Sequence, residues 1–353
     1  MKNQYVKIIL IALSSVLAII LLYFYVSADD KNISTTGNAD QNILPASGDR
    51  VLSDIDSILY SFGIRKDWIK EVNIKAKDQK KTGDELLFNK EIRIPYDLPV
   101  IDLNYEITNY FRKYDNEIKV TEDPRTKNIT MNINTVRDSL HKQTGTIKFL
   151  YSDTLKRNAA DIALVLDSLD LYSLKEAEVI LTSTQDFSVI LPLRNDKADY
   201  QSRIIELKRD YLLKLSVGDE DDIEADFKDG MKESVRSSKI KSLGLSFPNT
   251  TGVILINKTR NTDFFNAVKG DFVKNNMKVY YDSVFDGYKS NEKKVISIFE
   301  DIINESKRGK KILIYDINFS PEEFASYDRQ VYSMKKLGYR FYNFRDLLNK
   351  VKQ

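Results

Sequence analysis

The sequence predicts an α/β domain over residues 160–349, in which a parallel β-sheet is covered by α-helices. Two observations predict it: seven short apolar runs recur along this region, and amphipathic stretches with a helical period separate them. Such a sheet is either wound open or closed into a barrel. The predicted strands span residues 162–167, 187–193, 211–217, 252–257, 278–283, 311–317 and 339–344. The predicted helices span residues 174–181, 202–209, 223–235, 264–275, 295–306 and 322–337, and residues 242–247 are expected to pair with the sheet or to form a crossover.

Near the N-terminus lies an uninterrupted apolar segment, residues 8–28, without a charged side chain. At about 1.5 Å per residue, a helix of this segment spans the core of a bilayer. Two lysines precede the segment and two aspartates follow it, which orients the N-terminus to the cytoplasm. We therefore expect residues 1–28 to be a single-pass transmembrane anchor with the rest of the chain outside. A cleaved signal peptide is the alternative, because small residues at 26–28 offer a cleavage site.

Three further regions are predicted between the anchor and the α/β domain. Residues 29–50 are polar and rich in Asn, Ser, Thr and Gly, which is typical of a flexible linker. Residues 51–89 form a small helical segment that contains the single tryptophan, Trp68, which we expect to be a core anchor. Residues 90–152 combine a helical stripe with strand patterns and a turn, so we expect a small α+β module.

The composition excludes several classes of protein. Its 54 basic and 52 acidic residues give a formal net charge of +2, without the excess positive charge that binds a nucleic acid. The lack of cysteine excludes disulfides, thiolate zinc sites and a cysteine nucleophile. The single histidine, His141, lies in a polar stretch and is expected at the surface, because a metal site needs several converging donors.

Five segments of the α/β region carry a family resemblance, in order along the chain. They are ALVLDSLD at 163–170, FSVILPL at 187–193, YLLKLSVGDE at 211–220, KVYYDS at 278–283 and LGYRFYNFRDLL at 337–348. Together they resemble the divergent polysaccharide deacetylase family. The resemblance implies an irregular seven-stranded β/α barrel, a hydrolase active on carbohydrates and a divalent metal as the cofactor.

The sequence departs from the family at the positions that carry its chemistry. In the family, the first Asp of an Asp-Asp pair acts in catalysis and the second helps to hold the metal. Asp167 matches the first position, whereas Ser168 replaces the second. Lys214 stands where the family has a histidine, and Tyr315-Asp316 replaces a late Gly-His. A hydroxyl is a poor metal donor and a charged lysine offers no lone pair, so we expect the metal site to be lost and no cofactor to be bound.

Three aspartates end predicted strands of the α/β domain. Asp167, Asp282 and Asp316 are therefore expected at the same open end of the sheet, together with Lys214. Three carboxylates at one end could bind a hard cation or supply a base in a glycan cleft. The alternative is that they cap helices or pair with Lys214 and Arg340. We expect this second, structural role to be the better description.

These observations predict a membrane-anchored, extracytoplasmic protein of the cell envelope that resembles a deacetylase but has lost its metal site. Its expected role is non-catalytic binding of a cell-envelope polysaccharide or of a protein partner, without nucleic acid. One alternative is an active, atypical carbohydrate esterase that uses Asp167. A second alternative is a structural envelope-assembly protein whose contact surface is the small module at residues 90–151.

Overall fold

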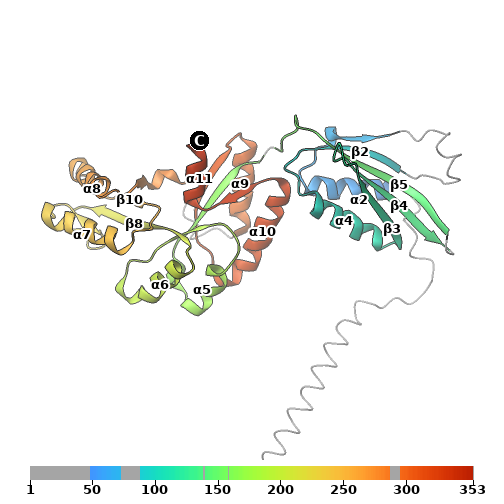
Figure 1. Ribbon diagram of the computed structural model, residues 1–353. Helices are drawn as coiled ribbons and strands as arrows, with labels where there is room; N and C mark the ends of the chain where they lie inside the picture. Colours follow the sequence, from blue (N-terminus) through green and yellow to red (C-terminus); the bar gives the residue numbers. More distant parts are fainter. Residues whose placement is uncertain (1–47, 73–87, 138–139, 158, 287–294, 353) are drawn as a thin grey trace, which may run out of the picture.

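The structure is a computed structural model that describes residues 48–72, 88–137, 140–157, 159–286 and 295–352. The predicted anchor at residues 8–28 lies outside these residues, as does almost all of the predicted linker. Among the described helices, none combines the length and the apolar character that crossing a bilayer requires. The described chain forms two domains, an N-terminal one drawn in blue and green and a C-terminal one drawn from green to red (Figure 1).

The N-terminal domain is a five-stranded sheet with two helices on one face (Figure 1). The strand order is β1-β2-β5-β4-β3, and only the pair β2 and β5 is parallel. The hairpin that the sequence predicts is formed by β3 and β4, which pair in antiparallel fashion. The elements are α2 (Gly48–Ser61), β1 (Ile69–Glu71), β2 (Phe88–Ile94), α4 (Val100–Arg112), β3 (Asn116–Glu122), β4 (Ile129–Arg137) and β5 (Leu140–Tyr151).

One hydrophobic core holds this domain together. Apolar residues of α2 and α4 pack with Trp68 and with the inward side chains of the sheet, so the predicted helical segment and the predicted α+β module share one core. Trp68 is buried, as the sequence predicts. Lys90 of β2 is also fully buried, and its Nζ donates a hydrogen bond of 2.5 Å to Asp56 Oδ1 of α2. This ion pair fastens α2 to the sheet, because a buried ammonium needs a partner.

The C-terminal domain is built on an eight-stranded sheet, and every pair of neighbouring strands in it is parallel. The path runs β11-β10-β8-β7-β6-β12, with β13 beside the start of β6 and β9 beside the end of β8. All seven predicted strands are present. They are β6 (Asp161–Leu166), β7 (Ser188–Ile190), β8 (Asp210–Gly218), β10 (Val253–Asn257), β11 (Val279–Tyr281), β12 (Ile312–Ile317) and β13 (Arg340–Tyr342), and β9 (Phe227–Lys228) is the unpredicted eighth.

The helices follow the predicted alternation with one error. The helices are α5 (Leu174–Leu181), α6 (Ala198–Glu206), α7 (Glu233–Ser246), α8 (Thr262–Lys274), α9 (Val295–Lys307), α10 (Phe324–Leu337) and α11 (Phe344–Val351). The prediction of a helix over 223–235 is wrong, because Phe227 and Lys228 extend the sheet as β9 and Gly230 takes a positive φ of 83° before α7 begins. Residues 242–247 are therefore the end and the C-cap of α7, which is the crossover between the parallel strands β8 and β10, so the second expectation for this segment is confirmed.

The sheet is a half-barrel that no strand ladder closes within the described part of the chain. Near the gap, the backbone N–H of Asp286 donates to the carbonyl of Ile314 at 2.7 Å, and the Ile314 N–H donates to Asp286 Oδ2 at 2.9 Å. These contacts join the segment after β11 to the edge strand β12. The barrel that the resemblance implies is therefore open, and Asp286 bridges the gap between the β11 side and the edge strand β12.

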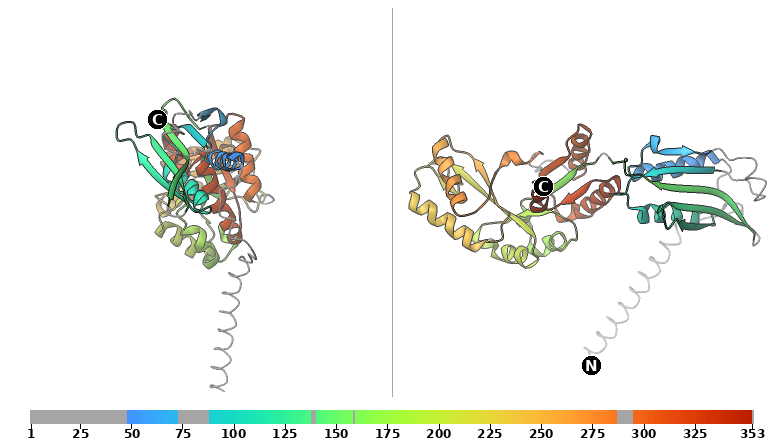
Figure 2. Two further views of the ribbon diagram at one scale, coloured as in Figure 1. Left: turned by 90° about the vertical axis from the view of Figure 1, so that its right-hand side faces the viewer. Right: turned by 45° about the horizontal axis from the view of Figure 1, so that its top comes forward.

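The two faces of the sheet have different cores. The outer face packs against α5 to α10 in the larger core, whereas side chains such as Val165, Leu212 and Ile254 point inward and pack against Phe344 and Leu347 of α11. Figures 1 and 2 show α11 beside the strands near the middle of the molecule.

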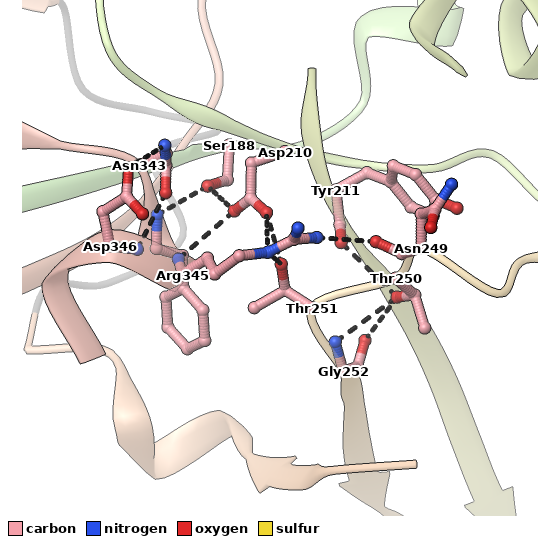
Figure 3. Close-up of polar contacts among 11 residues, drawn as sticks. Ser188, Asp210, Tyr211, Asn249, Thr250, Thr251, Gly252, Asn343, Arg345 and Asp346 are labelled. Carbon is pink, nitrogen blue, oxygen red and sulfur yellow. Dashed lines mark hydrogen bonds and ion pairs between the residues drawn. The ribbon is translucent and has the colours of Figure 1, made fainter. Parts of the chain in front are cut away.

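A polar network fixes the start of α11 at the amino end of the sheet (Figure 3). Ser188 Oγ accepts from the Phe344 N–H at 2.7 Å and donates to Asp210 Oδ2 at 2.6 Å. Arg345 Nε lies 3.2 Å from Asp210 Oδ1 and donates to Thr251 Oγ1 at 3.0 Å. The backbone N–H of Arg345, in the first turn of α11, also donates to Asp210 Oδ2 at 3.3 Å. This network is a structural anchor for α11.

Candidate functional site

Three charged side chains meet at the carboxyl end of the half-barrel. Asp167 directly follows β6, Asp316 is the penultimate residue of β12, and Lys214 lies in β8. Asp316 pairs in register with Val165, and side chains of a strand alternate between the two faces. Asp167 and Asp316 therefore share the inner face with Val165, just as Lys214 shares it with Leu212.

The three groups form one ion-paired cluster. Lys214 Nζ donates to Asp316 Oδ2 at 2.8 Å and makes a shorter contact with Asp167 Oδ2. The exposed fractions of the side chains are 24% for Asp167, 13% for Lys214 and 5% for Asp316, so Asp167 is the member nearest to solvent. We call these three residues the Asp–Lys–Asp cluster.

The pKa of Lys214 shows which effect dominates in the cluster. Burial disfavours the charged ammonium and lowers its pKa, but attraction to Asp167 and Asp316 outweighs burial and raises the pKa above its ordinary value. Lys214 is therefore a cation at neutral pH. The ammonium thus lies between two carboxyl groups, each of which accepts a hydrogen bond from Nζ.

The backbone is strained next to the cluster. Ser168 has a φ of 61° and a ψ of 25°, the left-handed conformation that a residue with a side chain rarely adopts. Its hydroxyl does not cap the short helical turn that follows. The sequence identified Ser168 only as a substitution in a family motif, and its backbone conformation could not be predicted from that pattern.

The structure places the remaining predicted residues away from the ion pairs. Asp282 follows β11 at the same end of the sheet, but its side chain is exposed, and within the described part of the chain it has no hydrogen bond or ion pair with Lys214. Tyr315 is buried in the outer core, on the opposite face from Asp316, and burial raises the pKa of its hydroxyl to about 12. Neither residue belongs to the Asp–Lys–Asp cluster.

Sequence reasoning missed a second polar pair near this end. Ser216 lies two residues after Lys214 in β8 and therefore on the same face. Its N–H and hydroxyl both donate to Asp226 Oδ2, at 2.8 Å and 3.1 Å. The alternation of side chains along β8 was sufficient to predict that Ser216 lies on the same face as Lys214. Asp226 could not be predicted, because it belongs to an acidic loop whose path the sequence does not specify.

The residues at this end do not fit the divalent metal that the resemblance implies. The space between the two carboxylates is taken by the Lys214 ammonium, which has no lone pair to donate. No set of three or more His, Cys, Asp or Glu side chains in the described residues has the arrangement of a metal site. His141 lies in β5 of the other domain, paired with Val136.

Comparison with known proteins adds little to this geometry. No family model and no curated protein matches the chain. An uncharacterized protein from Agrobacterium tumefaciens C58 is similar in structure at 11% identity and a TM-score of 0.36, and the match covers 54% of this chain and 89% of that one. A mutant described as a CE4 family pseudoenzyme with restored enzymatic activity is 10% identical with a TM-score of 0.33, covering 69% of this chain and 97% of that one. Another mutant of a CE4 family pseudoenzyme is 11% identical with a TM-score of 0.31 over the same shares. These TM-scores are too low to establish a shared fold, so the α/β half-barrel is assigned from the strand order of this chain itself.

Proposed function

We propose that this chain is a divergent relative of the polysaccharide deacetylases whose strand-end site does not work as a metal-dependent hydrolase. The observation that carries the proposal is the position of Lys214 Nζ between the carboxylates of Asp167 and Asp316. The protein then acts as a binding module of the cell envelope, and its partner is a polysaccharide or another protein. The five ordered sequence segments support the relationship to the family.

The chemistry of the Asp–Lys–Asp cluster supports the non-catalytic role. A metal-dependent hydrolase needs several donor atoms and an open position where a water molecule is activated. The Lys214 ammonium fills the space between the carboxylates and repels a second cation at this short range. Asp167, to which the resemblance assigns catalysis, accepts a hydrogen bond from that ammonium, so its carboxylate is already engaged as an ion-pair partner.

The same ion pairs argue against an acidic ligand at this end of the sheet. Lys214 could hold an acidic sugar only if that ligand displaced Asp167 or Asp316, since both already accept hydrogen bonds from Nζ. A neutral polysaccharide or a protein surface is therefore the better candidate.

The proposal is tested on the purified protein by its metal content and by release of acetate from acetylated chitin or peptidoglycan fragments. We expect no stoichiometric divalent metal and no acetate above background. Stoichiometric zinc, cobalt or nickel together with chelator-sensitive acetate release would overturn the proposal and restore the hydrolase.

A retained esterase is a second candidate, and one observation favours it. The strained Ser168 directly follows Asp167, the most exposed member of the cluster, and such strain is concentrated at functional sites. In that case Asp167→Asn would abolish an acetate release that chelators leave unchanged. Acetate release measured without chelator therefore separates the two candidates, because the esterase releases acetate and the binding module does not.

A structural role in envelope assembly is the third candidate. Ile101 and Tyr105 lie one turn apart on α4 and are both exposed, at 85% and 66%. An apolar pair on the N-terminal domain favours contact with another protein. Loss of co-purifying envelope proteins on Ile101→Ser, with the fold intact, would support this role over glycan binding.

The membrane anchor belongs to the same proposal. The uncharged segment at residues 8–28, with lysines before it and aspartates after it, supports a single-pass helix with the two described domains outside the cytoplasm. Mass spectrometry of the mature protein tests this assignment. An N-terminus at Asp29 would replace the anchor by a cleaved signal peptide.

A further inference from the structure

A cavity of about 390 Å³ lies where the two domains meet. Its walls come from the loop after β2, from the segment that joins the domains and from the start of β13. This position is at the amino end of the half-barrel, because Arg340 pairs in register with Asp161, the first residue of β6. The cavity is therefore separate from the Asp–Lys–Asp cluster at the carboxyl end. The residues that matter for the argument are Tyr96, Asp97, Ser152, Arg157, Gly338 and Arg340.

The buried side chain of Arg157 holds the residues that line this cavity in fixed positions. Its guanidinium is almost fully buried, donates from Nε to Asp97 Oδ2 at 3.0 Å, and donates from the two terminal nitrogens to the carbonyls of Asp97 and Lys336. One side chain thus joins the N-terminal domain to the end of α10. Gly338 lies so close that a Cβ there would be 2.8 Å from Arg157 Nε.

Tyr96 supplies a supported aromatic ring at the cavity. It stacks on Tyr151 with the ring centroids 5.1 Å apart and the planes 15° from parallel. Nevertheless 67% of Tyr96 is exposed, and the residue lines the cavity. A ring that is held from one side and open on the other is suited to stack against a flat ligand.

Polar groups of both kinds face the same cavity. The carboxylate of Asp97 is held at Oδ2 by Arg157 and is half exposed, which leaves acceptor capacity for a ligand. Arg340 donates from Nε to Asp161 Oδ1 at 2.6 Å, but its side chain is 60% exposed and lines the cavity, so the guanidinium keeps donor capacity for a ligand. The charged lining residues are two acidic ones, Asp97 and Asp153, and three basic ones, Lys156, Arg157 and Arg340.

We propose that this cavity binds a neutral saccharide, with a sugar ring stacked on Tyr96 and its hydroxyls bonded to Asp97 and Arg340. A sugar ring presents an apolar C–H face and a rim of hydroxyls, which matches an aromatic ring beside one carboxylate and one guanidinium. Cavities of about 300–1,000 Å³ at domain interfaces are typical of small-ligand sites. Arg157 and Arg340 are already paired with Asp97 and Asp161, so little positive charge is left to hold a polyanion. This inference does not depend on the proposed function of the carboxyl-end site.

The test is binding of three neutral probes, cellotriose, maltotriose and tri-N-acetylchitotriose, to the purified full-length protein, measured by calorimetry and by saturation-transfer NMR. We expect at least one probe to bind and Tyr96→Ala to weaken its binding about tenfold or more. Tyr332→Ala is the control, because Tyr332 is also an exposed tyrosine, at 52%, but lies on α10 outside the cavity.

Two further variants test the position of this site. Arg340→Ala should weaken binding, whereas Lys175→Met, at an exposed lysine of α5 outside the cavity, should bind the probe as the wild type does. The inference is overturned if none of the three probes binds at millimolar concentration, or if Tyr96→Ala and Tyr332→Ala bind equally well. It is also overturned if Lys175→Met, still folded, is the variant that loses binding.

Discussion

Lys214 Nζ lies 2.8 Å from Asp316 Oδ2, although β7 and β6 separate their two strands in the sheet. Three strand spacings along a flat sheet would place β8 and β12 about 14 Å apart. The contact therefore exists only because the sheet curls and turns both side chains toward its concave face. Lys214 is the cation that holds the carboxyl ends of three strands together.

Replacing this cation should destabilise the C-terminal domain. Lys214→Met leaves the carboxylates of Asp167 and Asp316 close together without a counter-charge, and breaking a buried pair in this way costs about 3–5 kcal/mol. Chemical denaturation followed by circular dichroism measures the loss. Lys175→Met, at an exposed lysine of α5, is the control and should change stability by less than about 0.5 kcal/mol. Equal stability of the two variants would contradict a structural role for Lys214.

Lys214→His should turn the cluster into a metal site. The histidine side chain is shorter than that of lysine, but a zinc ion binds imidazole nitrogen at about 2.1 Å. The metal ion would therefore lie near the position that Nζ of Lys214 occupies in the wild type. The imidazole and the two carboxylates then supply three donors. We expect zinc to raise the Tm of Lys214→His and to leave that of the wild type unchanged, measured by thermal unfolding with and without chelator. A wild type stabilised by zinc to the same extent would show that the metal binds elsewhere.

The contribution of Lys214 should disappear at alkaline pH. Because its pKa is raised in the folded state, its contribution to stability is fully present below the unfolded pKa of about 10.4 and is lost as the pH rises through the folded pKa. The difference in Tm between wild type and Lys214→Met should thus be constant from about pH 7 to 9 and shrink above that range. The buried Tyr200 and Tyr315, with pKa values raised to about 12, titrate in both proteins and cancel in the difference.

The domain junction should be sensitive to a single methyl group. Gly338 and Gly309 have almost the same positive φ, 102° and 103°, but only a Cβ at Gly338 would meet another group, 2.8 Å from Arg157 Nε. Gly309→Ala should therefore cost about 1–2 kcal/mol of backbone strain. Gly338→Ala should cost about 1–3 kcal/mol more through overpacking. Urea unfolding of both variants measures the difference, and equal costs would show that Arg157 moves aside freely.

The sequence was sufficient for the strands and for the structural pairing of strand-end aspartates with Lys214, but not for which aspartates take part. The apolar runs predicted all seven strands, because buried parallel strands are short and almost purely apolar. The error at α7 arose in an acidic segment where Ile223 is 88% exposed, so an apolar residue there was no sign of a buried helical face. The expected pairing with Lys214 is confirmed for Asp167 and Asp316, whereas Arg340 pairs with Asp161. Which aspartates reach Lys214 depends on the curvature of the sheet, which no local pattern encodes. The buried pair of Lys90 and Asp56 is a long-range contact and was missed for the same reason.

The position of α11 in the chain also sets an order for folding. Every strand of the half-barrel is synthesised before α11, which supplies the apolar cover of the inner face. Until α11 arrives, Val165, Leu212 and Ile254 face water, and the nascent sheet presents an apolar surface of the kind that promotes aggregation of folding intermediates. A chain that crosses a membrane during synthesis would therefore complete this domain only when its final helix has reached the same compartment as the strands.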